Sequence, residues 1–153
     1  MRTEKLPRGL RNNNPGNIRN NDNIDWQGEI AIHEKRDFVF EEFKDRVSGY
    51  RALLKLLRNY NKLHGCRTIP DYVRRWAPEH ENNTSGYISR VCQEMGIPTT
   101  FVPDPDDKSI MCAMAAAISE VENGVPAILS EVEAGWDALL VERYYVCVLP
   151  FAW

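Results

Sequence analysis

The stretch Ile110-Met-Cys-Ala-Met-Ala-Ala-Ala-Ile-Ser-Glu-Val-Glu-Asn-Gly124 decides the fold class of this 153-residue chain. Its apolar residues recur every three or four positions, which is the spacing of one face of an α-helix. A glycine directly after such a run is the usual left-handed helix end. The stretch therefore predicts a buried helix from Ile110 to about Asn123, opened by Ser109, with Glu122 in its last turn at the edge of the apolar face.

The same periodicity predicts further helices on both sides of this stretch. Start or stop residues frame three of them, namely a Thr-x-x-Asp capping box or a Thr at the beginning and Gly or Pro at the end. The predicted helices run from Asp45 to Gly65, from Thr68 to Trp76, from Thr84 to Met95 and from Ile128 to about Leu140, with a connector from Pro98 to Asp107. The tail from Val141 to Trp153 is apolar and aromatic without a clear period, and fits either helix or extended chain packed on the core.

The N-terminal quarter has a different pattern. Residues 8–25 predict a loop, and short alternation between Trp26 and Phe43 predicts a small hairpin around the polar run Glu34-Lys-Arg-Asp37. No internal repeat or interdomain linker is present. We therefore expect one mainly α domain over residues 1–153, with a small β-hairpin near the N-terminus.

Composition narrows the class of protein. No run of about 18 apolar residues exists, so membrane insertion is not expected, and no hydrophobic stretch follows Met1 to Pro7 that would make a secretory signal peptide. Residues 1–75 hold 16 Lys and Arg against 10 Asp and Glu, a net +6, whereas residues 76–153 hold 3 against 12, a net −9. The basic residues are scattered among acidic ones, which disfavours nucleic-acid binding.

The sulfur and imidazole groups do not form a reactive or metal-binding pattern. Cys66, Cys92, Cys112 and Cys147 have no CxxC spacing, and the three histidines are far apart in the sequence. His64 and Cys66 stand two apart, so they do not share a helix face. We expect no metal, no cofactor and no Cys/His nucleophile.

Glu122 has the chemistry of a general acid. A carboxylate at a helix C-terminus opposes the helix dipole, which favours cations there. Partial burial beside apolar groups would raise its pKa further, so that it keeps its proton near neutral pH. A solvated glutamate at a helix end is the alternative, and the residues of this helix alone do not separate the two.

The loop Arg8-Gly-Leu-Arg-Asn-Asn-Asn-Pro-Gly-Asn-Ile-Arg19 is the second polar feature. Amide side chains donate and accept hydrogen bonds without charge, which suits a groove for a ligand rich in hydroxyl and amide groups. The same residues also stabilise turns through their own backbone. Asn14 and Asn17 are therefore either ligand-binding or turn-forming.

These residues resemble a family of phage lysozyme-like murein hydrolases related to goose-type lysozymes and lytic transglycosylases. The resemblance rests on five stretches in order: Arg8 to Arg19, Trp26-Gln-Gly28, Phe40 to Phe43 leading into Gly49-Tyr-Arg-Ala52, Trp76-Ala-Pro-Glu-His-Glu-Asn-Asn-Thr-Ser-Gly-Tyr87, and Glu122-Asn-Gly124. The first and fourth are specific. Two departures stand at the last stretch, where the family commonly has a His before the Glu and a Pro-Tyr pair after the Gly. This chain has Val121 and then Val125-Pro-Ala-Ile128.

The resemblance implies a lysozyme-like helical domain that cleaves the glycan strand of bacterial peptidoglycan, with Glu122 as the catalytic acid. In better-known relatives the Glu-bearing helix precedes the Asn-rich loop, whereas here it follows it. We therefore hypothesise a circular permutation that brings residues 11–19 and 76–87 against Glu122. Candidate substrate-binding residues are Asn14, Asn17, Arg19, Trp76, Glu81, Thr84 and Tyr87, although Trp76 also fits a core position and Thr84 a helix cap.

The sequence is compatible with several mechanisms. A muramidase would need a partner carboxylate, for which Glu81, Asp22 and Asp25 are candidates, whereas a lytic transglycosylase uses one Glu and the sugar's own hydroxyl. A non-catalytic murein-binding module of a virion or secretion machine is the alternative to an enzyme. Without a signal peptide, the chain would reach the periplasm or cell wall by holin release, virion delivery or contact-dependent secretion. The basic half of the chain is expected to face the anionic wall.

Overall fold

The computed structural model describes residues 5–148, and the side chains of residues 5–141. This part of the chain contains six α-helices, one 3-10 turn and no extended strand. The helices are α1 (Arg8–Arg11), α2 (Arg46–His64), α3 (Ile69–Trp76), α4 (Thr84–Met95), α5 (Lys108–Asn123) and α6 (Leu129–Val148), and the 3-10 turn η1 is Ile32–Glu34. The mainly α class expected from the sequence is confirmed.

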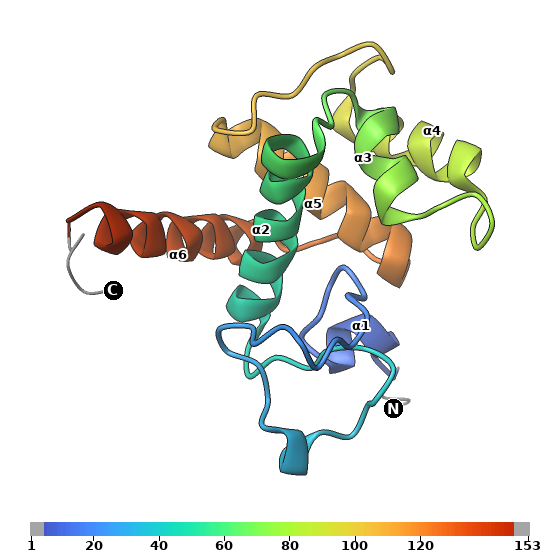
Figure 1. The fold of residues 1–153 in the computed structure, drawn as a ribbon. Helices are drawn as coiled ribbons and strands as arrows, with labels where there is room; N and C mark the ends of the chain where they lie inside the picture. Colours follow the sequence, from blue (N-terminus) through green and yellow to red (C-terminus); the bar gives the residue numbers. More distant parts are fainter. Residues whose placement is uncertain (1–4, 149–153) are drawn as a thin grey trace.

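Helix α2 passes through the middle of the molecule and packs against α3, α5 and α6, whereas α4 packs on α3 and α5 (Figure 1). Helix α6 crosses α2 at Gly135, where an added Cβ would lie 2.7 Å from the Cβ of Tyr50 and 2.9 Å from the backbone nitrogen of Arg51. The two helices therefore meet nearly backbone to backbone. The apolar faces enclose the larger of two buried apolar clusters, to which α2 contributes Tyr50, Leu53, Leu54 and Leu57, α5 contributes Met111, Met114 and Ile118, and α6 contributes Val132 and Trp136.

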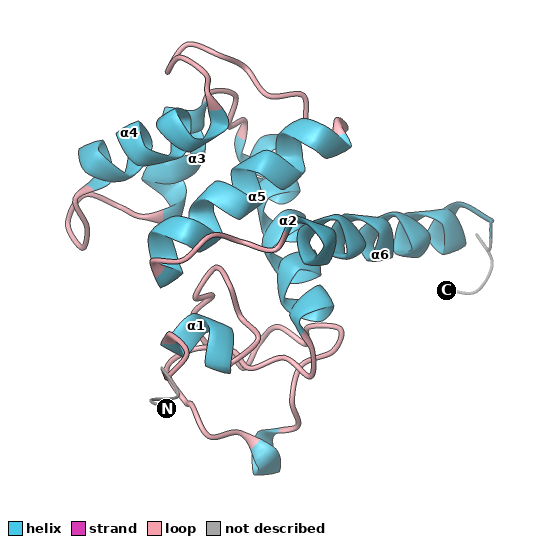
Figure 2. Ribbon diagram, turned by 180° about the vertical axis from the view of Figure 1, so that it is seen from behind, coloured by secondary structure: helices cyan, strands magenta, loops and turns pink. Residues whose placement is uncertain are grey.

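Seen from behind, α5 runs across α2 and ends beside the N-terminal segment and α1 (Figure 2). The C-terminal part of α6 extends away from the other helices in both ribbon views. Of the tail that begins at Val141, the part up to Val148 is helical and belongs to α6. Its last five residues, and the side chains that were expected to pack on the core from residue 142 onward, lie outside the described residues. Among the helices described, none combines the length and apolar character that a membrane span requires.

Capping residues explain where the helices begin and end. The Asp45 carboxylate caps α2 by accepting a hydrogen bond from the backbone N–H of Ser48 at 2.8 Å, and Gly65 closes the helix in the left-handed conformation, as expected. Two starts differ from the expectation. Asn83, not Thr84, caps α4, and Asp107, not Ser109, caps α5. Asn and Asp are at least as good caps as Thr and Ser, and each stands one or two positions earlier.

The expected β-hairpin between residues 26 and 43 does not form, and α1 adds one helical turn to the expected loop. The segment instead makes two isolated antiparallel bridges, which pair Arg19 with Phe40 and Glu29 with Phe43. The Asp37 carboxylate accepts hydrogen bonds from the backbone N–H groups of Val39 and Phe40. These N–H groups are consequently held by a side chain, in competition with a strand ladder.

A buried ion cluster gives a second reason why the hairpin is absent. The Nζ of Lys35 lies 3.5 Å from the carboxylate of Glu41 and 3.7 Å from that of Glu29. Glu41 is completely buried, and this burial raises its pKa to about 7. Because these polar side chains point into the segment, the alternation of inward apolar and outward polar residues that a hairpin needs is broken.

Candidate functional site

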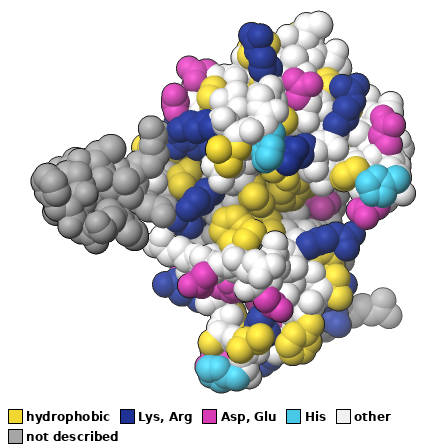
Figure 3. All heavy atoms as spheres, viewed as in Figure 1, with side chains coloured by type: hydrophobic (Ala, Val, Ile, Leu, Met, Phe, Trp, Pro, Cys, Tyr) yellow, Lys and Arg dark blue, Asp and Glu magenta, His cyan; other side chains and the backbone are white. Residues whose placement is uncertain are grey.

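A groove runs between the N-terminal segment and the helical part of the molecule. Its volume is about 340 Å³. Figure 3 shows the corresponding hollow, floored by hydrophobic side chains and bordered by basic and acidic ones. The lining residues come from segments far apart in the sequence: Gly16, Asn17, Ile18, Arg19 and Phe40 on one side, and Leu56, Tyr60, Trp76, Ala77, Glu81, Asn82 and Glu122 on the other.

Glu122 lies at this groove because α5 ends beside the N-terminal segment. Gly124, with a φ of 72°, terminates the helix two residues after it. Burial raises the pKa of the Glu122 carboxyl to about 7, while hydrogen bonding from the Asn17 side chain opposes this rise. A carboxyl with its pKa raised this far is able to hold its proton close to neutral pH, as a general acid must.

A second hollow of about 450 Å³ borders the other side of Glu122. Its lining residues are Asn82, Asn83, Gly86, Tyr87, Arg90, Val121 and Glu122. Tyr87 is 9% exposed. Burial and the Glu122 charge both raise the pKa of Tyr87 well above its usual range, although the contact of its hydroxyl with the side chain of Trp76 opposes this rise, so the phenol stays neutral. A neutral hydroxyl that borders the same hollow as the Glu122 carboxyl can orient that carboxyl or a ligand.

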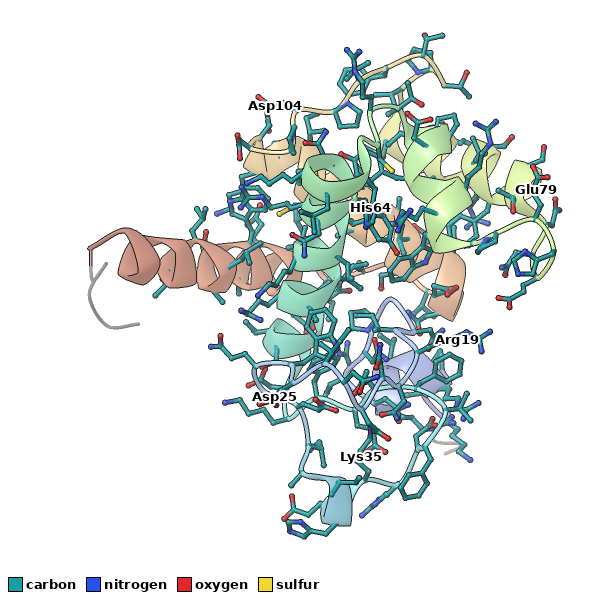
Figure 4. The ribbon with its side chains drawn as sticks, in the orientation of Figure 1. Arg19, Asp25, Lys35, His64, Glu79 and Asp104 are labelled. Atoms are coloured by element: carbon teal, nitrogen blue, oxygen red, sulfur yellow. The ribbon has the colours of Figure 1, made fainter. Side chains whose placement is uncertain are left out.

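An ion pair spans the open side of the groove. Arg19 from the N-terminal segment and Glu81 from the loop before α4 approach to 3.6 Å. Figure 4 shows Arg19 below the loop that also carries Glu79, whereas Asp25 lies on the other side of the N-terminal segment. Both members of the pair are substantially exposed, so a polar ligand can reach them. Trp76 forms the wall next to this opening, and its ring centroid lies 6.4 Å from that of Tyr60.

The structure separates Asn17 from Asn14 within the Asn-rich loop. Asn14 is completely buried, and its side chain donates to the carbonyls of Ile18 and Glu41 and accepts from the N–H of Ile18, each at 3.0 Å. Its amide therefore stabilises the turn, which was the alternative to ligand binding. Asn17 lines the groove in the left-handed conformation, with a φ of 50°.

Three other expected residues lie outside the groove. Thr84 is buried, and its hydroxyl donates to the carbonyl of Ala77 at 2.5 Å, so it joins the start of α4 to the end of α3. Asp22 and Asp25 line a separate hollow of the N-terminal segment together with Glu29 and Lys35. Of the three candidate partner carboxylates, only Glu81 shares a hollow with Glu122.

The sequence did not predict that Phe40, Leu56 and Tyr60 line the groove. Tyr60 follows the buried Leu57 by three positions and so continues the apolar stripe of α2, but nothing in that stripe indicates which end opens to solvent.

The groove is not formed by the basic half of the chain alone. Residues 16–60 come from that half and residues 76–122 from the acidic half, so the site lies where the two meet. No three His, Cys, Asp or Glu side chains between residues 5 and 141 converge in a way that could hold a metal ion.

The raised pKa of Glu122 predicts a pH-dependent stability. The ordinary value is 4.5, so between about pH 4.5 and pH 7 the folded state binds more protons than the unfolded chain. Stability from this group therefore falls as the pH rises through that window. We expect Glu122→Gln to have a higher Tm than the wild type at pH 8, with a smaller gap at pH 4. Thermal unfolding at both pH values checks this, and a gap that does not depend on pH would contradict the burial of Glu122.

A bacteriophage protein is similar to this chain over most of its length. No protein-family model matches the chain. The chain is 40% identical over 133 residues to Protein P5 of Pseudoalteromonas phage PM2, and the match covers 85% of this chain and 80% of that protein. The chain therefore belongs to the family of this bacteriophage protein.

Proposed function

We propose that this protein cleaves the glycan strand of bacterial peptidoglycan, with Glu122 as the general acid that protonates the glycosidic oxygen. The observation that carries the proposal is the position of one carboxyl, with a pKa of about 7, between two adjoining hollows. A strand lying through both hollows would place a sugar on each side of Glu122. A protonated carboxylic acid at the bond between the two sugars is what glycoside cleavage requires.

The positions of the recognised stretches support the proposal. Residues 16–19, residues 76–87 and Glu122 border the same pair of hollows, although up to about a hundred positions separate them in the chain. A circularly permuted lysozyme-like domain accounts for this meeting of segments in an unusual order. Trp76 and the amide of Asn17 supply the apolar face and the hydrogen-bonding group that N-acetylated sugars take up.

The bacteriophage origin of the relative favours a role at the bacterial cell wall. A phage must pass this wall on entry and on exit, so delivery within a virion or release at lysis would both bring the enzyme to its substrate. A virion component is accordingly the partner that we propose besides peptidoglycan itself.

Glu81 is the candidate second carboxylate of a hydrolytic mechanism. Hydrolases place two carboxyl groups about 5 to 9.5 Å apart across the scissile bond, and Glu81 shares the groove with Glu122. We expect Glu81→Gln to lower the rate of a hydrolase by a factor of about 10² or more. A lytic transglycosylase would tolerate this change, because the sugar supplies its own nucleophile. Initial rates of Glu81→Gln, with Glu79→Gln in the same loop as the control, distinguish the two mechanisms.

Mass analysis of the products from purified peptidoglycan tests the proposed activity. Soluble muropeptides with reducing ends would identify a muramidase, and 1,6-anhydro ends would identify a lytic transglycosylase. Wall binding without any soluble fragment would contradict an enzyme and indicate a non-catalytic murein-binding module.

A further inference from the structure

The amide side chain of Asn123 joins the end of α5 to the Asn-rich loop. Its Nδ2 donates to the carbonyl of Pro15 at 2.8 Å and to the carbonyl of Ser119, one turn back in α5, also at 2.8 Å. The first bond links residues 108 positions apart, and Asn123 is 7% exposed. A buried amide that bridges two backbone carbonyls fixes the distance between the segments that carry them.

The other end of the same side chain meets α1. A Cβ added to Gly9 would lie 2.5 Å from Oδ1 of Asn123 and 2.8 Å from Oδ1 of Asn17. Since a hydrogen of Gly9 occupies that direction, its Cα–H group faces both amide oxygens. Neither oxygen has a conventional hydrogen-bond donor within the described residues. Only a glycine at position 9 allows the two amides to come this close together.

Asn17 is in turn held by the segment that Asn123 anchors. The N–H of Asn17 donates to the carbonyl of Asn14 at 2.9 Å, and the N–H of Asn14 donates to the carbonyl of Gly9 at 2.8 Å. Gly16 passes closely over Trp76, so the loop between Pro15 and Asn17 has little room to shift. The side chain of Asn17 lines the same groove as Glu122, and hydrogen bonding from it lowers the pKa of the Glu122 carboxyl. A continuous set of contacts therefore leads from Asn123 through Pro15 to Asn17.

We propose that Asn123 is a positioning residue: through the Pro15 carbonyl and the contact at Gly9 it sets Asn17 against Glu122. The role in catalysis rests on the proposed function, whereas the positioning itself does not. Asn123 directly follows the acid in the sequence, but the hydrogen bonds that its Nδ2 donates within the described residues go to Pro15 and Ser119. It acts on Glu122 by holding the opposite wall of the groove.

Titration of Glu122 reports this alignment without any substrate. Hydrogen bonding from Asn17 favours the charged carboxylate, so losing it should raise the pKa of Glu122 by about one pH unit. None of the variants replaces another titratable group that lines the two hollows. These groups are Arg19, Tyr60, Glu81, Tyr87 and Arg90. A change in the titration can therefore be assigned to the amide contact.

The experiment is an NMR titration of ¹³C-labelled glutamate carboxyls, with the Glu122 signal assigned from its absence in Glu122→Gln. We expect Asn17→Ala and Asn123→Ala each to raise the pKa of Glu122 by about one pH unit, and the double variant to show no further rise. Gly9→Ala, which pushes both amides from the other side, is expected to shift the pKa in the same direction. It keeps the test available if Asn123→Ala does not fold.

Asn61→Ala is the matched control, because the Asn61 amide likewise donates to a backbone carbonyl after a helix end, that of Cys66 at 2.8 Å. Asn61→Ala should leave the titration of Glu122 unchanged. An unchanged pKa in folded Asn123→Ala, or additive shifts in the double variant, would overturn the positioning role. Absence of cleavage by the wild type would overturn the proposed function alone. If cleavage occurs, Asn123→Ala should lower kcat much more than it raises KM.

Discussion

Glu122→Gln is expected to lower the rate of glycan cleavage by a factor of about 10² to 10⁴, the usual contribution of a general acid. The amide has nearly the shape of the carboxyl but cannot release a proton to the leaving oxygen. Substrate binding should be retained, because the groove walls are unchanged, so the loss should appear in kcat. The wild-type rate itself should fall as the pH rises past about 7, where Glu122 loses its proton.

Glu120→Gln is the control for this prediction. Glu120 is two residues before Glu122 on the same helix, and its carboxylate lies 3.4 Å from the guanidinium of Arg90. Its replacement removes the same charge from α5 without removing the proton donor. Initial rates on purified peptidoglycan give both values. Equal rates for Glu122→Gln and Glu120→Gln would mean that Glu122 does not carry the chemistry.

Gly49→Ala should have the largest effect on stability. An added Cβ would lie 1.9 Å from the carbonyl oxygen of Asn13 and 2.8 Å from Cδ of Pro15. The first of these neighbours is backbone and the second is a proline ring, so no flexible side chain can move aside. We expect a loss of about 3 kcal/mol in the free energy of unfolding, the upper end of the usual cost of overpacking, together with loss of the groove wall that the Asn-rich loop forms.

Gly65→Ala provides the comparison, since Gly65 has a φ of 67° and nothing lies within 4 Å of its would-be Cβ. There only the left-handed backbone is penalised, by about 1 to 2 kcal/mol. Urea unfolding of both variants measures the difference. A smaller loss for Gly49→Ala than for Gly65→Ala would contradict the close approach of α2 to the Asn-rich loop.

Local signals in the sequence were sufficient for most helices. The apolar period of α5 and the glycines that follow α2, α4 and α5 are read directly from neighbouring residues, and their positions agree with the structure. The prediction of a hairpin was wrong because Lys35 and Glu41 are buried, whereas a sequence pattern assigns charged residues to the surface. A buried ion pair between two residues six positions apart does not change the periodicity of apolar residues, so the sequence does not indicate it.

The site was predictable only in part. Glu122 could be singled out from its place at a helix end, but its contact with Asn17 depends on tertiary packing. The sequence does not separate Asn14 from Asn17, because one of the contacts that hold Asn14 in the interior, with the carbonyl of Glu41, comes from 27 residues away. Tyr60 and Asn123 were missed because one continues a core stripe and the other follows an apolar helix, so neither differs locally from a structural residue.

The most direct test of the account is to map a glycan on the inactive protein. Addition of a peptidoglycan-derived tetrasaccharide to ¹⁵N-labelled Glu122→Gln should shift the amide signals of Asn17, Arg19, Trp76 and Tyr87, which border the two hollows. The signals of Asp22 and Asp25, in the separate hollow, should stay in place. Shifts confined to other surfaces, or no shifts at millimolar glycan, would contradict a glycan-cleaving site at Glu122.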